Sequence, residues 1–124
     1  MTTLDSAEAP LRLPTSSSPT IQAIMAYTQA HLADVSAQEV CAAAGLSERS
    51  LRRQFPMATG MSWQQYRVTS RILRAMAILA QSDRTVLDVA VAVGFDSLSG
   101  FNRAFLRLCG ETPSAYRRRI ARRD

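Results

Sequence analysis

The sequence predicts an all-α protein, and three observations carry this prediction. Alanine and leucine dominate the 124 residues while only 5 are glycine, a composition that suits helices better than a β-sandwich. Apolar residues recur at helical spacing along most of the chain. Helix-start residues precede these stretches and glycines follow several of them. The length limits the chain to one domain, or to two very small units that share a core.

The ends of the chain differ in pattern from its middle. Residues 1–18 carry Ser, Thr and Pro without periodicity, and we expect a flexible tail or linker there. Residues 19–119 are expected to form the folded domain, and residues 120–124 a basic tail.

Helix starts are marked by residues that can cap the free N–H groups of a first turn. The predicted caps are Ser18 (before Pro19), Ser36, Ser47, Ser62, Thr85 and Thr112. Ser36 and Ser62 belong to capping boxes, because Glu39 and Gln65 follow three residues later. The longest helix is predicted from Ser62 to about Ala80. Residues expected to face inward in the two short helices are Val40, Ala43 and Ala44, and Val86, Val89, Ala90 and Val93.

The chain contains an internal repeat. Gly45 and Gly94, each ending a short helix, lie 49 residues apart. Beyond these glycines the offset becomes 50, and it pairs Leu51 with Phe101, Arg53 with Arg103, Phe55 with Phe105, Gly60 with Gly110, Tyr66 with Tyr116 and Arg67 with Arg117. A repeat of this size indicates a duplicated supersecondary unit. Each copy reads as a short helix, a glycine turn and a second helix, which is the helix-turn-helix plan.

The second helix of each unit is two-faced. In the first unit Leu51 and Phe55 define the core side. In the second unit the core side is expected to hold Leu98, Phe105, Leu108 and Cys109. Arginines lie on the opposite face in both units, and a polar face alone fits either a solvated surface or a DNA-reading surface.

Charge favours the DNA-reading alternative. The net charge is +5 and the sequence pI is near 10.2, and a basic balance indicates an anionic partner. Nothing indicates an enzyme, a metal or a cofactor: there is one His, and the two cysteines, Cys41 and Cys109, form no metal-binding motif. The chain shows neither a signal peptide nor an apolar run of about 18 residues, so we expect a soluble cytoplasmic protein without membrane contact.

The segment Gly94–Arg118, GFDSLSGFNRAFLRLCGETPSAYRR, resembles the C-terminal signature of the AraC-type family of bacterial transcription regulators. The positions that fill the family pattern are Gly94, Phe95, Ser97, Ser99, Phe101, Arg103, Phe105, Gly110, Pro113, Tyr116 and Arg117. The upstream stretch VCAAAGLSERSLRRQF is similar to the first motif of the family. The resemblance covers roughly residues 20–118.

The resemblance implies about seven helices, with two helix-turn-helix units (about 36–57 and 85–109) joined by a long central helix. The second helix of each unit would enter a major groove, with the two grooves on one face of double-stranded DNA about 34 Å apart. Effector-binding or dimerising domains are common in the family. The resemblance therefore leaves open an effector-binding domain outside this chain as a further partner. RNA polymerase is another partner that stays open.

Base reading is assigned to side chains on the predicted outer faces, because Arg pairs with guanine edges and Asn with adenine. These residues are Arg49, Arg52 and Arg53 in the first unit and Ser99, Asn102 and Arg103 in the second. Arg103 fills a fixed motif position, so a phosphate or structural contact is its alternative role. Phosphate contacts are assigned to helix starts and further arginines: Ser36, Ser62, Thr85, Thr112, Arg67, Arg107 and Arg117.

Two residues, Pro56 and Gly100, depart from the family pattern. Pro56 predicts that the first reading helix is short or kinked. Gly100 costs about 1 kcal/mol within the second reading helix and leaves no side chain for DNA. Leu98 is expected on the core side of its helix, and contact with a thymine methyl group is its alternative role.

The competing function is a helical adaptor that docks on polymerase through its arginine face, without sequence-specific DNA binding.

Overall fold

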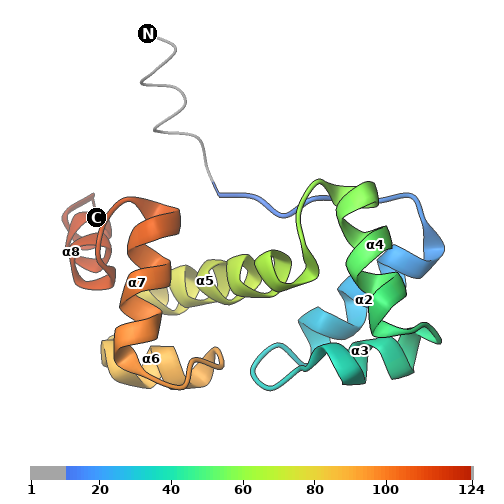
Figure 1. Cartoon of the computed structure of the whole chain (residues 1–124). Coiled ribbons are helices and arrows are strands. Elements are labelled where there is room, and N and C mark those ends of the chain that lie inside the picture. The colour runs from blue at the N-terminus through green and yellow to red at the C-terminus, as the bar shows by residue number, and fades with distance from the viewer. Residues whose placement is uncertain (1–10, 124) are drawn as a thin grey trace, which may run out of the picture.

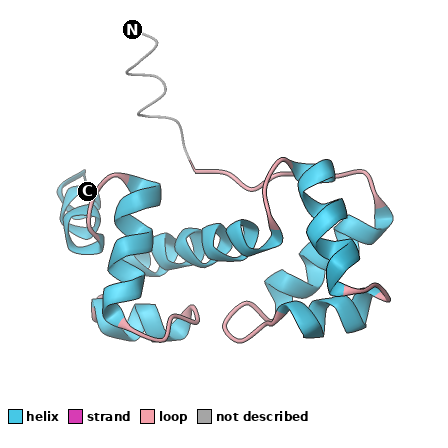
Figure 2. Ribbon diagram, viewed as in Figure 1, coloured by secondary structure: helices cyan, strands magenta, loops and turns pink. Residues whose placement is uncertain are grey.

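The computed structural model describes residues 11–123, and within that range it contains seven helices and no strand (Figure 2). The helices are α2 (Pro19–Ala30), α3 (Ala37–Ala44), α4 (Glu48–Thr59), α5 (Trp63–Gln81), α6 (Val86–Ala92), α7 (Leu98–Cys109) and α8 (Pro113–Arg123). The all-α prediction is confirmed. Residues 1–10 and 124, which belong to the two expected tails, lie outside the described residues, and α8 continues to Arg123.

The predicted helix starts are confirmed by their hydrogen bonds. The Oγ of Ser18 accepts from the backbone N–H of Ile21, two residues after Pro19 begins the helix. Both capping boxes are complete: the Ser36 and Ser62 side chains each accept from the third helical residue, whose side chain accepts in return. These local bonds fix where the chain turns into each helix, and therefore where the loops between helices fall.

The helices form two lobes around α5, which crosses the middle of the molecule (Figure 1). Buried residues form two clusters, one in each lobe. The N-terminal core consists of Ile21, Ile24, Val35, Val40, Cys41, Leu51, Phe55, Trp63 and Tyr66. The C-terminal core consists of Ile72, Ala75, Leu79, Val89, Ala90, Val93, Phe101, Ala104, Phe105 and Tyr116. The first half of α5 contributes to one cluster and the second half to the other, so this helix connects the two lobes.

The repeat seen in the sequence is also a repeat of structure. Helices α4 and α7 each have 12 residues and each ends at a glycine with positive φ, 81° at Gly60 and 77° at Gly110. Helix α5 packs on α4 as α8 packs on α7, and the paired Tyr66 and Tyr116 are both buried. Each lobe is therefore a helix-turn-helix unit packed on two further helices, α2 and the first half of α5 in one lobe, and the second half of α5 and α8 in the other.

One of the two alternatives predicted for α4, a short helix, is wrong. Helix α4 is not shortened by Pro56: it continues to Thr59, because Leu51 and Phe55 anchor the helix on the N-terminal core. Only the last turn loses a backbone donor, and that turn faces solvent.

Two predicted core residues are exposed instead. Ala43 is exposed because α3 packs through Val40 and Cys41, and Ala43 lies to the side of the face that these two residues share. Leu98 is 38% exposed and is not among the residues that pack on the C-terminal core.

The two lobes also touch each other outside α5. Leu11 packs against the C-terminal core and Leu13 against the N-terminal core, so the segment before α2 crosses from one lobe to the other (Figure 1). On another side of α5, Gly94 lies directly against the backbone of Ala33 and the guanidinium of Arg71. None of the helices described has both the length and the apolar character that a membrane span requires.

Candidate nucleic-acid interface

Helix α7 presents a polar face opposite its buried face. Phe101 and Phe105 are buried, while Ser99 and Arg103 are exposed and Asn102 is partly buried at the flank. The Nη1 of Arg103 donates to the Oγ of Ser99 at 2.9 Å, one helical turn away. The three residues predicted to read bases in this unit therefore share one side of the helix.

Helix α4 presents the corresponding face in the first lobe. Arg49, Arg52 and Arg53 are all exposed, and none of them forms a hydrogen bond or ion pair with another described residue. Their guanidinium donors are available to a ligand. A guanidinium fork matches the O6 and N7 acceptors of guanine and the oxygens of phosphate.

Helices α4 and α7 stand at the two ends of α5, both running across its axis (Figure 1). Since each lobe repeats the same arrangement, their exposed faces occupy equivalent places in the two units. The fold thus brings the two predicted base-reading sets to matching positions on one molecule.

Two arginines predicted to contact phosphate, Arg67 and Arg117, donate to backbone carbonyls of the protein itself. The Nη1 of Arg67 donates to the carbonyl of Val35 at 2.9 Å, and its guanidinium lies 5.1 Å from the ring of Trp63. Burial lowers the pKa of Arg67, and the charge of Asp96 opposes this shift. The paired residue, Arg117, donates from Nε to the carbonyl of Leu79 at 3.1 Å.

The other predicted phosphate contacts are distributed over both lobes. Ser36, Ser62, Thr85 and Thr112 cap the helices α3, α5, α6 and α8, so their hydroxyl groups bond to their own helix starts. Arg107 is exposed in the last turn of α7. A phosphate role for these residues stays a prediction.

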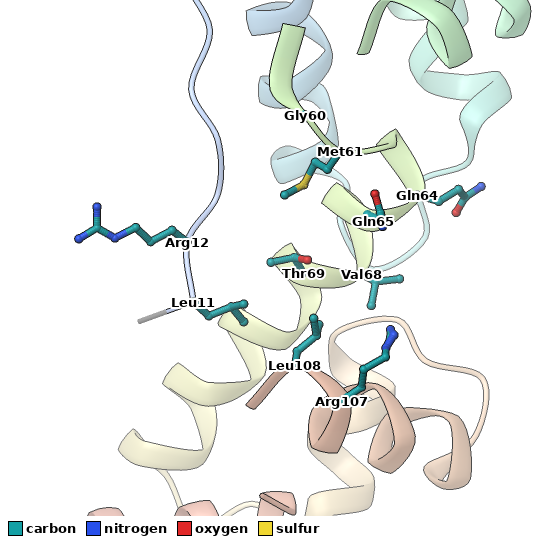
Figure 3. Close-up of a pocket in the computed structure, with 10 residues that line it drawn as sticks. All are labelled: Leu11, Arg12, Gly60, Met61, Gln64, Gln65, Val68, Thr69, Arg107 and Leu108. Carbon is teal, nitrogen blue, oxygen red and sulfur yellow. The ribbon is translucent and has the colours of Figure 1, made fainter. Parts of the chain in front are cut away.

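A cleft of about 510 Å³ separates α7 from the first half of α5 (Figure 3). Leu11, Val68 and Leu108 converge in it, while Arg107 extends toward Val68 and Arg12 points away (Figure 3). The cleft therefore has an apolar floor between the lobes and a basic side chain at the end of α7.

Sequence reasoning assigned no role to Leu106. Its side chain is 50% exposed and lies on the outer face of α7, one turn beyond Asn102 and Arg103. The helical register set by Phe101 and Phe105 places residue 106 on that face, so the signal was present in the sequence.

Comparison with known proteins matches this geometry to a family. A family model described as a helix-turn-helix domain covers residues 40–119. The AraC-type DNA-binding protein of Chromobacterium violaceum has the same fold, with a TM-score of 0.78 over 83% of this chain and 93% of its own, at 24% identity. The chain belongs to the AraC-type helix-turn-helix family.

Two helix-turn-helix transcription regulators share more of the sequence. The regulator RipA of Corynebacterium glutamicum is 40% identical over 81 residues, which are 65% of this chain and 24% of RipA. The activator RhaR of Escherichia coli is 36% identical over 84 residues, 68% of this chain and 30% of RhaR. The chain therefore spans less than a third of the length of these two relatives.

One of the similar structures was solved with bound DNA. The DNA-binding domain of AdpA, a global transcriptional factor, was crystallised in complex with a target DNA. It is 32% identical to this chain, with a TM-score of 0.78 over 86% of this chain and 96% of that domain. The AraC-type fold found here is thus one that is known to be compatible with bound DNA.

Proposed function

We propose that this chain binds double-stranded DNA in a sequence-specific manner, placing α4 and α7 in consecutive major grooves, and thereby regulates bacterial transcription. The observation that carries the proposal is the pair of equivalent reading helices at the two ends of α5, each with exposed arginine. The likeness to the DNA-bound AdpA domain supports it. The bacterial cytoplasm, where the chromosome lies, is the proposed place of action.

The physical mechanism follows from the shape of DNA. A major groove about 12 Å wide admits one α-helix, and consecutive grooves on one face are about 34 Å apart. The rigid helix α5 holds the two reading helices at a fixed separation, so one chain contacts two half-sites without dimerising. Arg49, Arg52 and Arg53 would read one half-site, and Ser99, Asn102 and Arg103 the other.

Two further partners belong to this proposal. Because the chain spans only 24% of RipA and 30% of RhaR, we include an effector-binding domain outside these residues. RNA polymerase is included because RhaR is named a transcriptional activator. Catalysis is no part of the proposed function.

The test begins with a duplex selected by the full chain from a random pool. Mobility-shift titrations then compare Arg52→Ala and Arg53→Ala on this duplex and on a scrambled one. Each variant is expected to lose about 5- to 150-fold in affinity for the selected duplex and little for the scrambled one, because one bidentate base contact is removed.

The control is Arg122→Ala, which removes the same charge from α8, outside both reading helices. It should change both affinities by the same small factor. Equal losses on both duplexes for Arg52 and Arg53 would remove their base-reading role. No enriched duplex at all would favour the adaptor alternative.

A further inference from the structure

We propose that the two reading helices recognise half-sites of different base composition: α4 a G·C-rich half-site and α7 an A·T-rich half-site. The inference rests on the proposed function and deepens it, because it assigns a chemical class of DNA to each lobe. It comes from comparing equivalent outer-face positions of the two helices.

The equivalence is fixed by the ends of the helices. Ser47 and Ser97 cap α4 and α7, both helices have 12 residues, and both end at a glycine. An offset of 50 residues therefore pairs every position of α4 with one of α7. One stripe along the outer flank holds Glu48, Arg52 and Pro56 in α4, and Leu98, Asn102 and Leu106 in α7.

The α4 stripe has the hydrogen-bonding pattern of a G·C reader. Arg52 has only donors, which match the O6 and N7 acceptors of guanine. Glu48 is exposed and has only acceptors, which match the N4 amino group of cytosine. The third member of the stripe, Pro56, is only partly exposed and has no side-chain hydrogen-bonding group.

The α7 stripe has the opposite character. Leu98 is 38% exposed and Leu106 is 50% exposed, so neither is accounted for by the C-terminal core. Asn102 lies between them and can pair with the N6 and N7 atoms of adenine. Two leucine side chains flanking an asparagine offer methyl-binding surface on either side of an adenine contact.

The surface beside Leu106 allows a close approach to bases. Gly100 has no side chain and Ala104 has a short one, so an open hollow of about 520 Å³ lies between them and Arg103, Leu106 and Arg107. The equivalent residues of α4 are Ser50 and Gln54, which are longer. Helix α7 can therefore lie deeper in its groove, where the thymine methyl groups project.

The same leucines could instead bind a protein. The arginines beside the leucines favour DNA as the ligand. Arg103 and Arg107 are exposed on the adjoining face, and a protein partner with an apolar surface would have to cover these two charges. The test below separates these two ligands.

The first experiment sequences the duplexes that the full chain selects from a random pool. The expected site has two cores about one helical turn apart, one rich in G·C and one rich in A·T. Two G·C-rich cores would overturn the inference and leave the proposed function intact. Failure to enrich any bipartite site would count against the proposed function itself.

The second experiment removes only the methyl groups, by replacing thymine with uracil in the A·T-rich core. The wild type should bind the uracil duplex about four-fold more weakly for each contacted methyl, the factor expected for one buried methyl-sized group. Each leucine variant should lose the preference for thymine at its own position. Leu106→Ala should bind the thymine and uracil duplexes equally where Leu106 contacts the methyl group, and Leu98→Ala should do so where Leu98 contacts it.

Leu87→Ala is the matched control, because Leu87 is 52% exposed but lies on α6, outside the reading helices. It should keep the wild-type preference for thymine. A wild type that binds both duplexes equally, or leucine variants that both keep the full preference, would overturn the inference and favour a protein ligand for this face.

Discussion

At the scale of single residues, the arginines of this chain divide into exposed ones, such as Arg52 and Arg53, and ones whose side chains are held by the fold. Some lie within the fold: Arg71 is only 8% exposed, and its Nε donates to the carbonyl of Leu32 at 2.9 Å. Burial lowers the pKa of Arg71, the charge of Arg67 lowers it further, and Asp96 and Asp34 oppose the shift. Such arginines belong to α5 and donate to backbone carbonyls, so only part of the basic charge lies on the two helices that we propose to read DNA.

Arg117 gives a prediction at this scale. Its guanidinium donates to the carbonyls of Leu79 and Ser82, at 3.1 and 3.2 Å, and so ties α8 to the end of α5. Arg117→Ala should lower the free energy of unfolding by about 1–2 kcal/mol, because two charge-assisted bonds are lost. Urea unfolding measures this, with exposed Arg118→Ala as the control that should leave the midpoint unchanged.

The same variants separate the two roles of Arg117. An unchanged unfolding midpoint together with weaker binding to every duplex would favour the phosphate contact predicted from the sequence. A lower midpoint with normal affinity, measured where the variant is fully folded, would show a structural role alone.

At the scale of elements, the position of Pro56 within α4 gives the next prediction. Proline has no N–H, so the carbonyl of Arg52 lacks its partner in the helix. Pro56→Ala should restore this bond and raise the free energy of unfolding by about 1–2 kcal/mol. This net gain is smaller than the full cost of a proline within a helix, because the unfolded chain regains conformational entropy when the proline is removed.

The control is Leu106→Ala at the equivalent position of α7, where an ordinary N–H is already present. Thermal unfolding of both variants checks the difference. A Pro56→Ala variant less stable than the wild type would mean that the proline ring makes contacts that outweigh the missing bond.

What the sequence could predict depends on how local each feature is. Caps such as Ser36 and Ser62 were predictable, because their partners are three residues away. The exposure of Leu98 was not, because periodicity gives the direction of a side chain and not the extent of the neighbouring lobe. The partners of Arg67 and Arg117 lie 32 and 38 residues away, and only the folded chain brings them together.

The residues of the candidate site also divide into those that local sequence predicts and those that it does not. Register alone placed Arg49, Arg53 and Arg103 on outer faces, where the structure has them. Leu106 could have been found from the same register. It was missed because an apolar residue in a helix is assigned to a core by default, although an exposed one can bind a methyl group equally well.

At the scale of the whole molecule, the proposed function depends on the separation of the two reading helices. Helix α5 sets the distance between the lobes, and two contacts resist rotation about it. One is the segment with Leu11 and Leu13, and the other is the contact between Gly94 and the backbone of Ala33. These contacts lie on different sides of α5, so both must give way if the lobes turn (Figure 1).

Substitution of Gly94 tests this coupling between the lobes, and substitution of its repeat partner Gly45 is the control. Gly94 and Gly45 both have positive φ, 106° and 71°, but only at Gly94 would a Cβ meet other atoms. It would collide with the carbonyl oxygen of Ala33 and lie 2.9 Å from the guanidinium carbon of Arg71. Gly45→Ala should therefore cost only the backbone strain, about 1–2 kcal/mol, and leave the lobes in place.

Gly94→Ala should cost more than Gly45→Ala, and it should also change DNA recognition. Since the backbone of Ala33 cannot swing aside as a side chain would, the second lobe has to move away from the first. The preference for the selected duplex over one with an extra base pair between the half-sites should then shrink in Gly94→Ala and persist in Gly45→Ala. Mobility shifts on the two duplexes measure that ratio. Equal ratios in both variants would mean that α5 alone fixes the separation of the reading helices.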